Sequence, residues 1–320
     1  SQVIQSELIL QAQPFKQCHA STLTELNDHS ILVAFFGGSY EGAPDVCIWA
    51  VHQTANQWSQ PIRLADGRVS DTVAFPCWNP VLFNSKSGKI YLFYKVGKNP
   101  REWFGMMKST DNQGLTWTQP VHLPDGILGP IKNKPVERSD GQILCPSSTE
   151  TNTEWKVQME IFDPKNHSWV ARPVDPSSSF QVIQPTLLAY NDSTFRILCR
   201  SKSDSIITAL TRDYGINWSP LCALNLPNPN SGIDAVTLTN GSHLLVYNPL
   251  TSGKEWVNGR NRLNLAWSAD GLQRTDIFVL EDAPSGEYSY PAIIQSADQL
   301  IHIVYTYNRS QIKYWKIRLQ

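Results

Sequence analysis

Two carboxylates that could act as an acid or a base lie in a loop-forming phrase near the start of the chain. The phrase GGSYEGAPD holds Glu41 and Asp45 among glycine and proline residues. A carboxyl group in such a loop can keep its proton near neutral pH if aromatic neighbours exclude water from it. We expect Glu41 to be the acid or base, because Asp45 opens the next strand and can instead brace the loop. Loop bracing is the alternative for both.

Two arginines could bind an anionic group. Arg200 ends the phrase RILCR, and Arg260 lies in NGRNRLNL, where Arg262 is the alternative. Two guanidinium groups that converge from separate parts of the chain offer paired hydrogen-bond donors to a carboxylate or a sulfate. The alternative for each arginine is a solvated place on the surface, with its stem packed against the protein.

Further polar residues stand in similar phrases rich in Gly, Pro and Asn, and we expect them to bind a substrate. They are Asn79, Lys95, Lys132, Lys134, Glu150, Asn228, Asn230 and Asp234. Lys95 or Lys134 could add an anion contact, although only as a point charge without the planar fork of arginine. Because such groups recur in every part of the chain, they favour one shared pocket over scattered surface positions.

The elements that must position these residues are β-strands. Apolar and polar residues alternate, with many β-branched and aromatic side chains, in ILVAFF, KIYLFYKV, ILCPS, FRILCR, HLLVYN and LIHIVYTY. A turn signal precedes each run, at Asn27-Asp28, Ser87-Gly88, Asp140-Gly141, Asn191-Asp192, Asn240-Gly241 and Ala297-Asp298. Six hairpins thus recur at a spacing of roughly 48 to 60 residues, which is typical of propeller blades.

A second repeat supports the first. Tryptophan followed by proline recurs in QWSQP, TWTQP, SWVARP and NWSP, at Trp58, Trp117, Trp169 and Trp218. A four-stranded blade cannot bury its faces alone, so neighbouring blades must stack around a channel. We predict an all-β, six-bladed β-propeller that forms a single domain over residues 1–320. Its N-terminal strand, VIQSELIL, should complete the last blade beside QIKYWKIRL.

Composition narrows the classes of function. The 320 residues carry a formal net charge of -1, which disfavours nucleic acid as a partner. No apolar run is long enough to span a membrane, and the sequence does not open with a signal-peptide pattern, so we expect no membrane partner. No nucleotide-binding or metal-binding motif is present, so we expect no cofactor and no metal. The six cysteines lack any paired spacing and several lie in apolar runs, so we predict that they are buried free thiols. They favour a cytoplasmic location, or a secreted or periplasmic one if a leader was removed.

One turn motif links the chain to a known family. STDNQGLTW, from Ser109 to Trp117, resembles the Asp-box of sialidases, and TRDYGINW and SADG are weaker copies. The likeness extends over nearly the whole chain, through phrases such as FFGGSYEGAPDVCIW, LPNPNSGIDAV and EYSYPAII, and is to the bacterial predicted neuraminidases with BNR repeats. It implies a sialidase-like propeller and glycoside hydrolase activity. The box itself is a structural turn, in which the Asp side chain satisfies backbone donors.

The resemblance also implies roles for single residues. Tyr288, in the Tyr-Ser phrase of EYSYPAI, matches the family nucleophile, although a core aromatic is the alternative. A tyrosine suits an anomeric carbon that already bears a negative group, which would repel a carboxylate. Glu287 would point to the opposite face of a regular strand, so it reaches the pocket only through a bulge. Arg200 and Arg260 match the second and third family arginines, and Glu41 or Asp45 lies where the acid/base belongs.

Two departures weaken the sialidase mechanism. His19 stands where the family has its first arginine, and Gln184 stands where it has the glutamate that assists the tyrosine. A glutamine cannot take a proton, so acid/base work could instead fall to His19, Glu150 or Asp234. The resemblance still implies an exo-glycoside hydrolase acting on a terminal sugar, acidic like sialic acid, although the two departures leave a different acidic or neutral sugar open.

Two alternatives stay open. One is a sugar lyase, in which a Tyr/His pair abstracts a proton next to a carboxylate. The other is a glycan-binding propeller without turnover. The candidate residues differ from blade to blade, which favours one asymmetric site over the repeated sites of a lectin.

Overall fold

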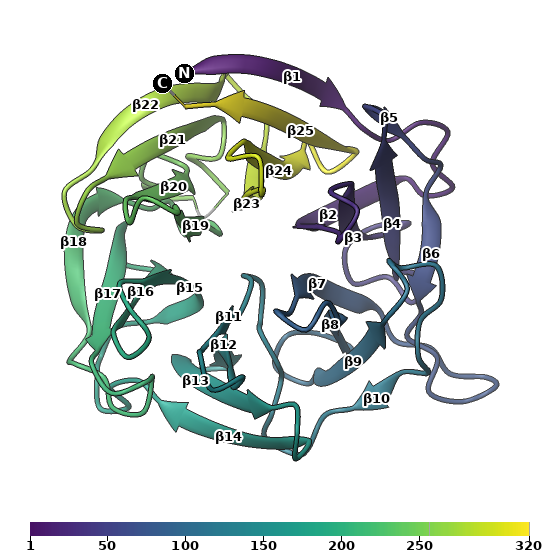
Figure 1. Ribbon diagram of the computed structural model, residues 1–320, viewed down its shortest axis with the longest axis horizontal. Helices are drawn as coiled ribbons and strands as arrows, with labels where there is room; N and C mark the ends of the chain where they lie inside the picture. The colour runs from purple at the N-terminus through teal and green to yellow at the C-terminus, as the bar shows by residue number, and fades with distance from the viewer. Residues whose placement is uncertain (256, 320) are drawn as a thin grey trace.

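The strands of the computed structural model, which describes residues 1–255 and 257–319, form a ring of sheets around a central channel (Figure 1). Within these residues there are six sheets, five of four strands and one of five. Each sheet is antiparallel, and the strands run outward in order from the channel. The chain is therefore an all-β, six-bladed propeller, as the repeats predicted.

Blades 1 to 3 occupy the first half of the chain. Blade 1 contains β2 (Gln17–Glu25), β3 (Ile31–Gly38), β4 (Cys47–Thr54), β5 (Gln57–Trp58) and β6 (Ile62–Ala65). Blade 2 contains β7 (Cys77–Asn84), β8 (Ile90–Val96), β9 (Phe104–Thr110) and β10 (Val121–His122). Blade 3 contains β11 (Val136–Glu137), β12 (Ile143–Glu150), β13 (Trp155–Asp163) and β14 (Ser168–Pro173).

Blades 4 to 6 complete the ring. Blade 4 contains β15 (Val182–Ala189), β16 (Phe195–Ser201), β17 (Ser205–Thr211) and β18 (Cys222–Pro227). Blade 5 contains β19 (Asp234–Thr237), β20 (His243–Tyr247), β21 (Arg262–Ser268) and β22 (Thr275–Asp282). Blade 6 contains β23 (Tyr288–Gln295), β24 (Ile301–Tyr307) and β25 (Gln311–Arg318), and its outer strand is β1 (Gln2–Leu8), so that the two ends of the chain lie side by side (Figure 1).

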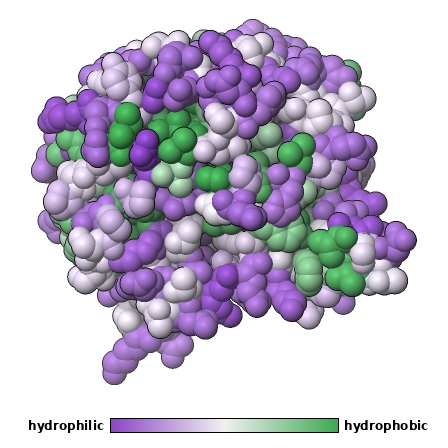
Figure 2. All heavy atoms as spheres, turned by 90° about the horizontal axis from the view of Figure 1, so that it is seen from below, coloured by the Kyte–Doolittle hydropathy of each residue, from purple (hydrophilic) through white to green (hydrophobic). Residues whose placement is uncertain are grey.

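Hydrophobic packing between blades holds the ring together. Buried apolar residues form a cluster at each of the six contacts between neighbouring blades, and a second, smaller cluster around Trp78 and Trp103 lies between blades 2 and 3. All eight residues of β3 are buried, because this strand lies between blade faces on both sides. On the side of the molecule that Figure 2 shows, polar residues cover most of the surface and apolar groups lie between them.

The Asp-box turns have the expected form, with one change of residue. In the second copy the Asp213 carboxylate accepts a hydrogen bond from the Asn217 amide at 2.9 Å. In the first copy Asn112 has this role and accepts from the Thr116 amide at 3.0 Å, so the motif is shifted by one residue from Asp111. The Trp117 and Trp218 rings close the two turns by donating to the carbonyls of Gly114 and Gly215.

A buried carboxyl group fixes the loop that leads into blade 3. Glu160 of β13 accepts hydrogen bonds from the backbone amides of Leu128 at 3.0 Å and Gly129 at 2.6 Å. Burial nevertheless raises the pKa of Glu160 from its ordinary 4.5 to about 7. The folded chain therefore favours the protonated form of Glu160 only below about pH 7.

We expect the Glu160→Gln variant to gain stability relative to the native chain as the pH rises. A carboxyl group with a raised pKa stabilises the fold below its unfolded-state pKa, and this contribution is lost as the pH rises through the folded-state value. At about 1.4 kcal/mol per pKa unit, the gap between the two free energies of unfolding should change by about 3 kcal/mol from pH 4.5 to pH 8. Urea denaturation at both pH values measures the gap, and a constant gap would contradict the prediction.

Helices play no part in the described fold. Over residues 1–255 and 257–319, no helix is long and apolar enough to cross a membrane.

Candidate functional site

β-Bulges shape four of the innermost strands at the same place. The pairing register shifts in β2, β7, β15 and β23. Within each bulge one residue has a positive φ: Ala20 at 60°, Asn79 at 36°, Gln184 at 54° and Tyr290 at 52°. A bulge re-aims the side chain that it carries. Three of these side chains, those of Asn79, Gln184 and Tyr290, line one pocket at the end of the channel where the inner strands begin.

Proline follows the bulged residue in three of the strands, as Pro80, Pro185 and Pro291. Proline has no N–H to add to the strand ladder and so suits a bulge. A residue other than glycine at positive φ costs roughly 1 to 3 kcal/mol, and such strain gathers at functional sites. The repeated strain therefore points to the pocket as the functional site.

Six residues expected at the site do line the pocket. They are Glu41, Asn79, Glu150, Gln184, Arg200 and Arg260. The rings of Trp78 and Trp103, with centroids 5.9 Å apart, form one wall. The structure thus brings together side chains from separate blades, as the scattered phrases predicted.

The phenol oxygen of Tyr290 accepts two hydrogen bonds in this pocket. Arg200 Nη1 donates to it at 2.8 Å, and Gln184 Nε2 donates at 3.1 Å. Arg200 Nη1 also donates to Gln184 Oε1 at 3.2 Å, which orients the amide so that its NH2 faces Tyr290. The phenol oxygen is the acceptor in both contacts, and two such donors can stabilise negative charge that develops on this oxygen during a reaction.

Buried groups fix the Tyr290 ring from behind. The imidazole of His19 stacks on it with centroids 4.1 Å apart, and His19 Nδ1 shares a 2.9 Å hydrogen bond with Thr306. Burial first, and then the nearby arginine charges, lower the pKa of His19 well below its usual value. The ammonium of Lys132 lies 5.6 Å from the centre of the Tyr290 ring and donates to the Pro291 carbonyl at 2.8 Å. His19 therefore supports the ring as a neutral imidazole.

Arg200 and Arg260 converge on one residue. Arg200 Nε donates to the side-chain oxygen of Asn230 at 2.8 Å, and Arg260 Nη2 donates to its backbone oxygen at 3.0 Å. Burial and the charge of the neighbouring Arg200 lower the pKa of Arg260. Arg262 begins β21 and does not line the pocket, so Arg260 is the arginine of the two that reaches it.

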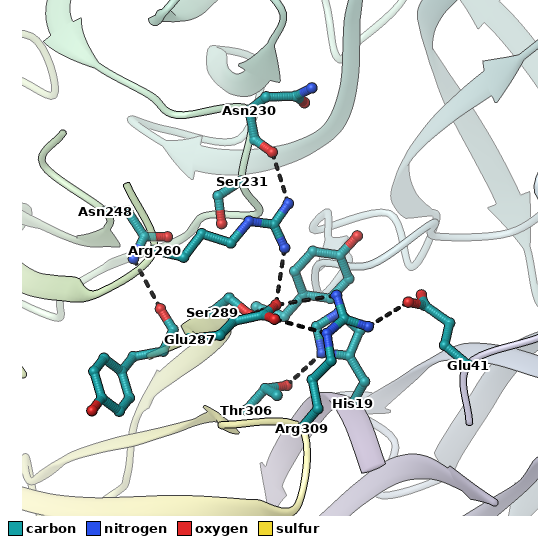
Figure 3. A network of polar contacts seen from close by, with 12 residues as sticks. His19, Glu41, Asn230, Ser231, Asn248, Arg260, Glu287, Ser289, Thr306 and Arg309 are labelled. Atoms are coloured by element: carbon teal, nitrogen blue, oxygen red, sulfur yellow. Dashed lines mark hydrogen bonds and ion pairs between the residues drawn. The ribbon is translucent and has the colours of Figure 1, made fainter. Parts of the chain in front are cut away.

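A chain of ion pairs continues around the rim from Arg260 (Figure 3). Glu287 accepts from Arg260 Nη1 at 3.0 Å and, through both carboxylate oxygens, from Arg309 Nε at 2.8 Å and Nη2 at 3.1 Å. Arg309 also pairs with Glu41. Burial opposes ionisation of Glu287, but Arg309 and Arg260 hold its pKa below the ordinary value. Glu287 thus stays charged and locks both arginines in place.

The pKa of Glu150 is shifted in the opposite direction from that of Glu287. Burial raises its pKa above the ordinary value, although the charges of Arg200, Lys202 and Arg101 act against this. Glu150 is therefore the pocket carboxyl group most suited to holding a proton that it can donate.

Tyr288 does not lie in the pocket. Its side chain is buried in the apolar cluster between blades 5 and 6, with its ring 5.0 Å from that of Tyr307. The sequence predicted that Tyr288 reaches the pocket, but the bulge begins only after Ser289 and turns Tyr290 inward instead. Glu287 precedes β23 and reaches the pocket arginines without needing a bulge.

Asp45 braces its loop. It accepts hydrogen bonds from the Ser39 hydroxyl and amide, and the hydroxyl bond is the main reason that its pKa is lowered. It is absent from the described pocket lining. This corrects Asp45 as a candidate acid or base and leaves Glu41 as the pocket member of that loop.

Three other expected ligands of the substrate lie away from the pocket. Lys95 is fully buried and donates to the carbonyls of Asn79 at 3.2 Å and Ile131 at 3.0 Å. Lys134 lies at the opposite end of the inner strands and pairs with Asp234 at 2.9 Å. Asp234 also accepts from Thr186 at 2.7 Å. These residues tie blades together, because backbone carbonyls and carboxylates satisfy their charges before a ligand can.

Two important pocket residues were missed from the sequence. Tyr290 precedes Pro291 just as Asn79 precedes Pro80 and Gln184 precedes Pro185, so the repeated X-Pro step could have revealed it. Arg309 lies in the turn between β24 and β25, in a sequence that carries no local signal of its role.

A larger cavity exists elsewhere but lacks this chemistry. It measures about 530 Å³, against about 150 Å³ for the central pocket, and lies between the outer strands of blades 1 and 2 beside Arg63 and Lys108. It holds none of the strained bulge residues Asn79, Gln184 and Tyr290. Among the described residues, no group of three or more His, Cys, Asp or Glu side chains is placed to hold a metal ion.

Family comparison agrees with this architecture. The family model described as the BNR repeat-like domain matches residues 29–303, which is most of the chain. The chain belongs to the BNR repeat-like family. No curated protein matches this BNR repeat-like sequence.

Solved structures share the propeller. A protein of unknown function from Dyadobacter fermentans is 14% identical with a TM-score of 0.78, covering 100% of this chain and 99% of that one. The NanB sialidase of Streptococcus pneumoniae is 13% identical with a TM-score of 0.76, covering 98% and 70%. The intramolecular trans-sialidase of Ruminococcus gnavus is 12% identical with a TM-score of 0.73, covering 99% and 98%. The BNR repeat-like chain therefore has the sialidase-like propeller fold.

Proposed function

We propose that this propeller is an exo-acting glycoside hydrolase that removes a terminal acidic sugar in the central pocket. The observation that carries the proposal is the contact of Arg200 and Gln184 with the Tyr290 oxygen, beside a second arginine and a protonatable Glu150. These groups combine anion binding, a nucleophile and an acid in one site.

The arginines support an acidic substrate. Arg200 and Arg260 both donate to Asn230 and both line the pocket, so their two positive charges favour an anionic group such as a carboxylate there. The pocket floor supports an exo mode of action, because Lys132 of blade 3 crosses the channel to the carbonyls of Ile233 and Pro291. A closed floor admits the end of a glycan chain but not its middle.

The proposed reaction has two steps. In the first, Tyr290 Oη bonds to the anomeric carbon while Glu150 gives its proton to the departing glycosidic oxygen, and the phenol proton passes to pocket water or to Glu41. In the second, Glu150 takes a proton from a water molecule, which attacks the anomeric carbon, and Tyr290 departs and takes back its proton from pocket water or Glu41. Arg200 and Gln184 stabilise the charge on the tyrosine oxygen in both steps.

A panel of nitrophenyl glycosides tests the proposal. It contains the nitrophenyl glycosides of sialic acid, octulosonic acid and glucuronic acid, and the nitrophenyl glycoside of rhamnose is the neutral control. We expect nitrophenol release from an acidic member and none from rhamnoside. Release from none of them would overturn the hydrolase, an unsaturated product absorbing in the ultraviolet would indicate a lyase, and cleavage of rhamnoside alone would overturn the anion-binding role of the arginines.

We further propose a cytoplasmic location. All six cysteines are free, and Cys18, Cys77, Cys145 and Cys199 are buried, which supports a reducing compartment.

A further inference from the structure

The rim of the pocket beside Glu150 carries an aromatic platform. Glu150 ends β12 and pairs in register with Trp155, the first residue of β13. The Trp155 amide donates to the side-chain oxygen of Gln181 at 2.9 Å, which ties the hairpin to blade 4. Trp155 is thus held next to the candidate general acid at the mouth of the pocket.

Two cations lie against this platform. Lys202 Nζ is 4.0 Å from the centre of the Trp155 ring, and Arg200 Cζ is 5.5 Å from it. Arg200 lines the pocket, whereas Lys202 is exposed outside it. The Lys202 amide donates to the Gln181 carbonyl at 3.1 Å, so Gln181 anchors both the lysine and the tryptophan. Positive charge therefore extends along the ring from the pocket to the rim.

A third cation completes the rim. Arg101 follows Pro100, which lines the pocket, and its amide donates to the Asn99 side chain at 2.9 Å. The charges of Lys202 and Arg101 both act on the Glu150 carboxyl group. Within residues 1–255 and 257–319, neither Lys202 nor Arg101 makes an ion pair with a carboxylate. Their charge is therefore available to a ligand.

This arrangement determines what can occupy the leaving-group side. A general acid must lie within hydrogen-bond reach of the glycosidic oxygen. If Glu150 protonates this oxygen, the leaving group attached to it must extend over the rim beside Glu150. We propose that Trp155, Lys202 and Arg101 form a leaving-group subsite for a second anionic sugar, such as a uronate or a sulfated residue. The inference rests on the proposed hydrolase and extends it: the substrate is an oligosaccharide with consecutive acidic residues.

A pair of matched substrates tests the subsite. The leaving group is a phenol that bears either a meta-carboxylate or a meta-carboxamide, attached to sialic acid and to glucuronic acid. The two leaving groups have nearly the same shape and differ in charge. We expect kcat/KM to be about tenfold higher for the carboxylate at low salt, and the preference to shrink as salt screens the rim. Lys202→Gln and Arg101→Gln should each reduce this preference, measured as the ratio of the two kcat/KM values.

Lys156→Gln is the matched control, because Lys156 lies on the same hairpin but already donates to the Ser178 carbonyl at 2.6 Å. Its preference should equal that of the native chain. Equal rates for both leaving groups in the native chain, or an unchanged preference in Lys202→Gln, would overturn the subsite while leaving the hydrolase intact. If neither compound is cleaved, the proposed hydrolase activity is wrong, and binding affinities of the same two compounds, measured by calorimetry, test the subsite instead. Tighter binding of the carboxylate that is lost in Lys202→Gln would support the subsite. Equal affinities would overturn it.

Discussion

Replacing Tyr290 with phenylalanine is expected to lower kcat by roughly a thousandfold or more, because the variant keeps the ring and loses only the oxygen that would attack the sugar. The stacked contact with His19, 4.1 Å between centroids, needs no hydroxyl group. The fold should therefore survive, and KM should change far less than kcat. Steady-state kinetics on the acidic glycoside identified by the panel measure both.

Tyr288→Phe is the matched control. The Tyr288 side chain lies in the apolar cluster between blades 5 and 6, so losing its hydroxyl should cost about 1 kcal/mol of stability and leave kcat nearly unchanged. A slow glycosyl fluoride should also leave its sugar attached to Tyr290, which peptide mass spectrometry can locate. Full activity in Tyr290→Phe, together with loss of activity in Tyr288→Phe, would return the nucleophile to the position expected from the sequence.

The fold was predictable because its signals are local. Each blade carries its own turn and its own alternating strand, so residues such as Asn240-Gly241 indicate a hairpin without knowledge of the rest of the chain. The Asp-box shows the limit of pattern matching. The sequence pattern pointed to Asp111, but Asn112 is the residue that fills the aspartate position of the turn. Its amide oxygen can accept the hydrogen bond from the Thr116 backbone amide as a carboxylate would.

The site was only partly predictable, because its residues meet through long-range contacts. The expectation that Arg200 and Arg260 converge agrees with their shared contact to Asn230. Lys95 and Lys134 looked equally polar in sequence, yet in the folded ring backbone carbonyls accept hydrogen bonds from Lys95, and Asp234 forms an ion pair with Lys134. No local pattern distinguishes a lysine that binds a ligand from one that ties blades together.

The prediction of Tyr288 in place of Tyr290 as the pocket tyrosine has a more specific cause. Alternation along a regular strand puts residues two apart on the same face, so Tyr288 and Tyr290 would be equivalent. The bulge after Ser289 breaks this equivalence, and positive φ at Tyr290 aims its side chain at Gln184 and Arg200. Strain of this kind is visible only in three dimensions, although the following proline hints at it.

Replacing Glu150 with glutamine gives the second large effect that we expect. Glutamine fills the same space but cannot donate a proton to the leaving oxygen, so kcat for a sugar leaving group should fall by roughly a hundredfold to ten-thousandfold. A dinitrophenyl leaving group needs little protonation, and its cleavage should fall much less. The exposed Glu154, on the same hairpin, supplies the control variant Glu154→Gln, which should behave like the native chain.

The pH profile gives an independent measure of the role of Glu150. Burial raises the pKa of Glu150, and a general acid works only in its protonated form. Native kcat/KM should therefore hold at low pH and fall as the pH rises through this raised pKa, whereas Glu150→Gln should lack that alkaline limb. Because Lys202 opposes the rise, Lys202→Gln should move the limb to higher pH. An alkaline limb that survives unchanged in Glu150→Gln would mean that another pocket carboxyl group, such as Glu41, supplies the proton.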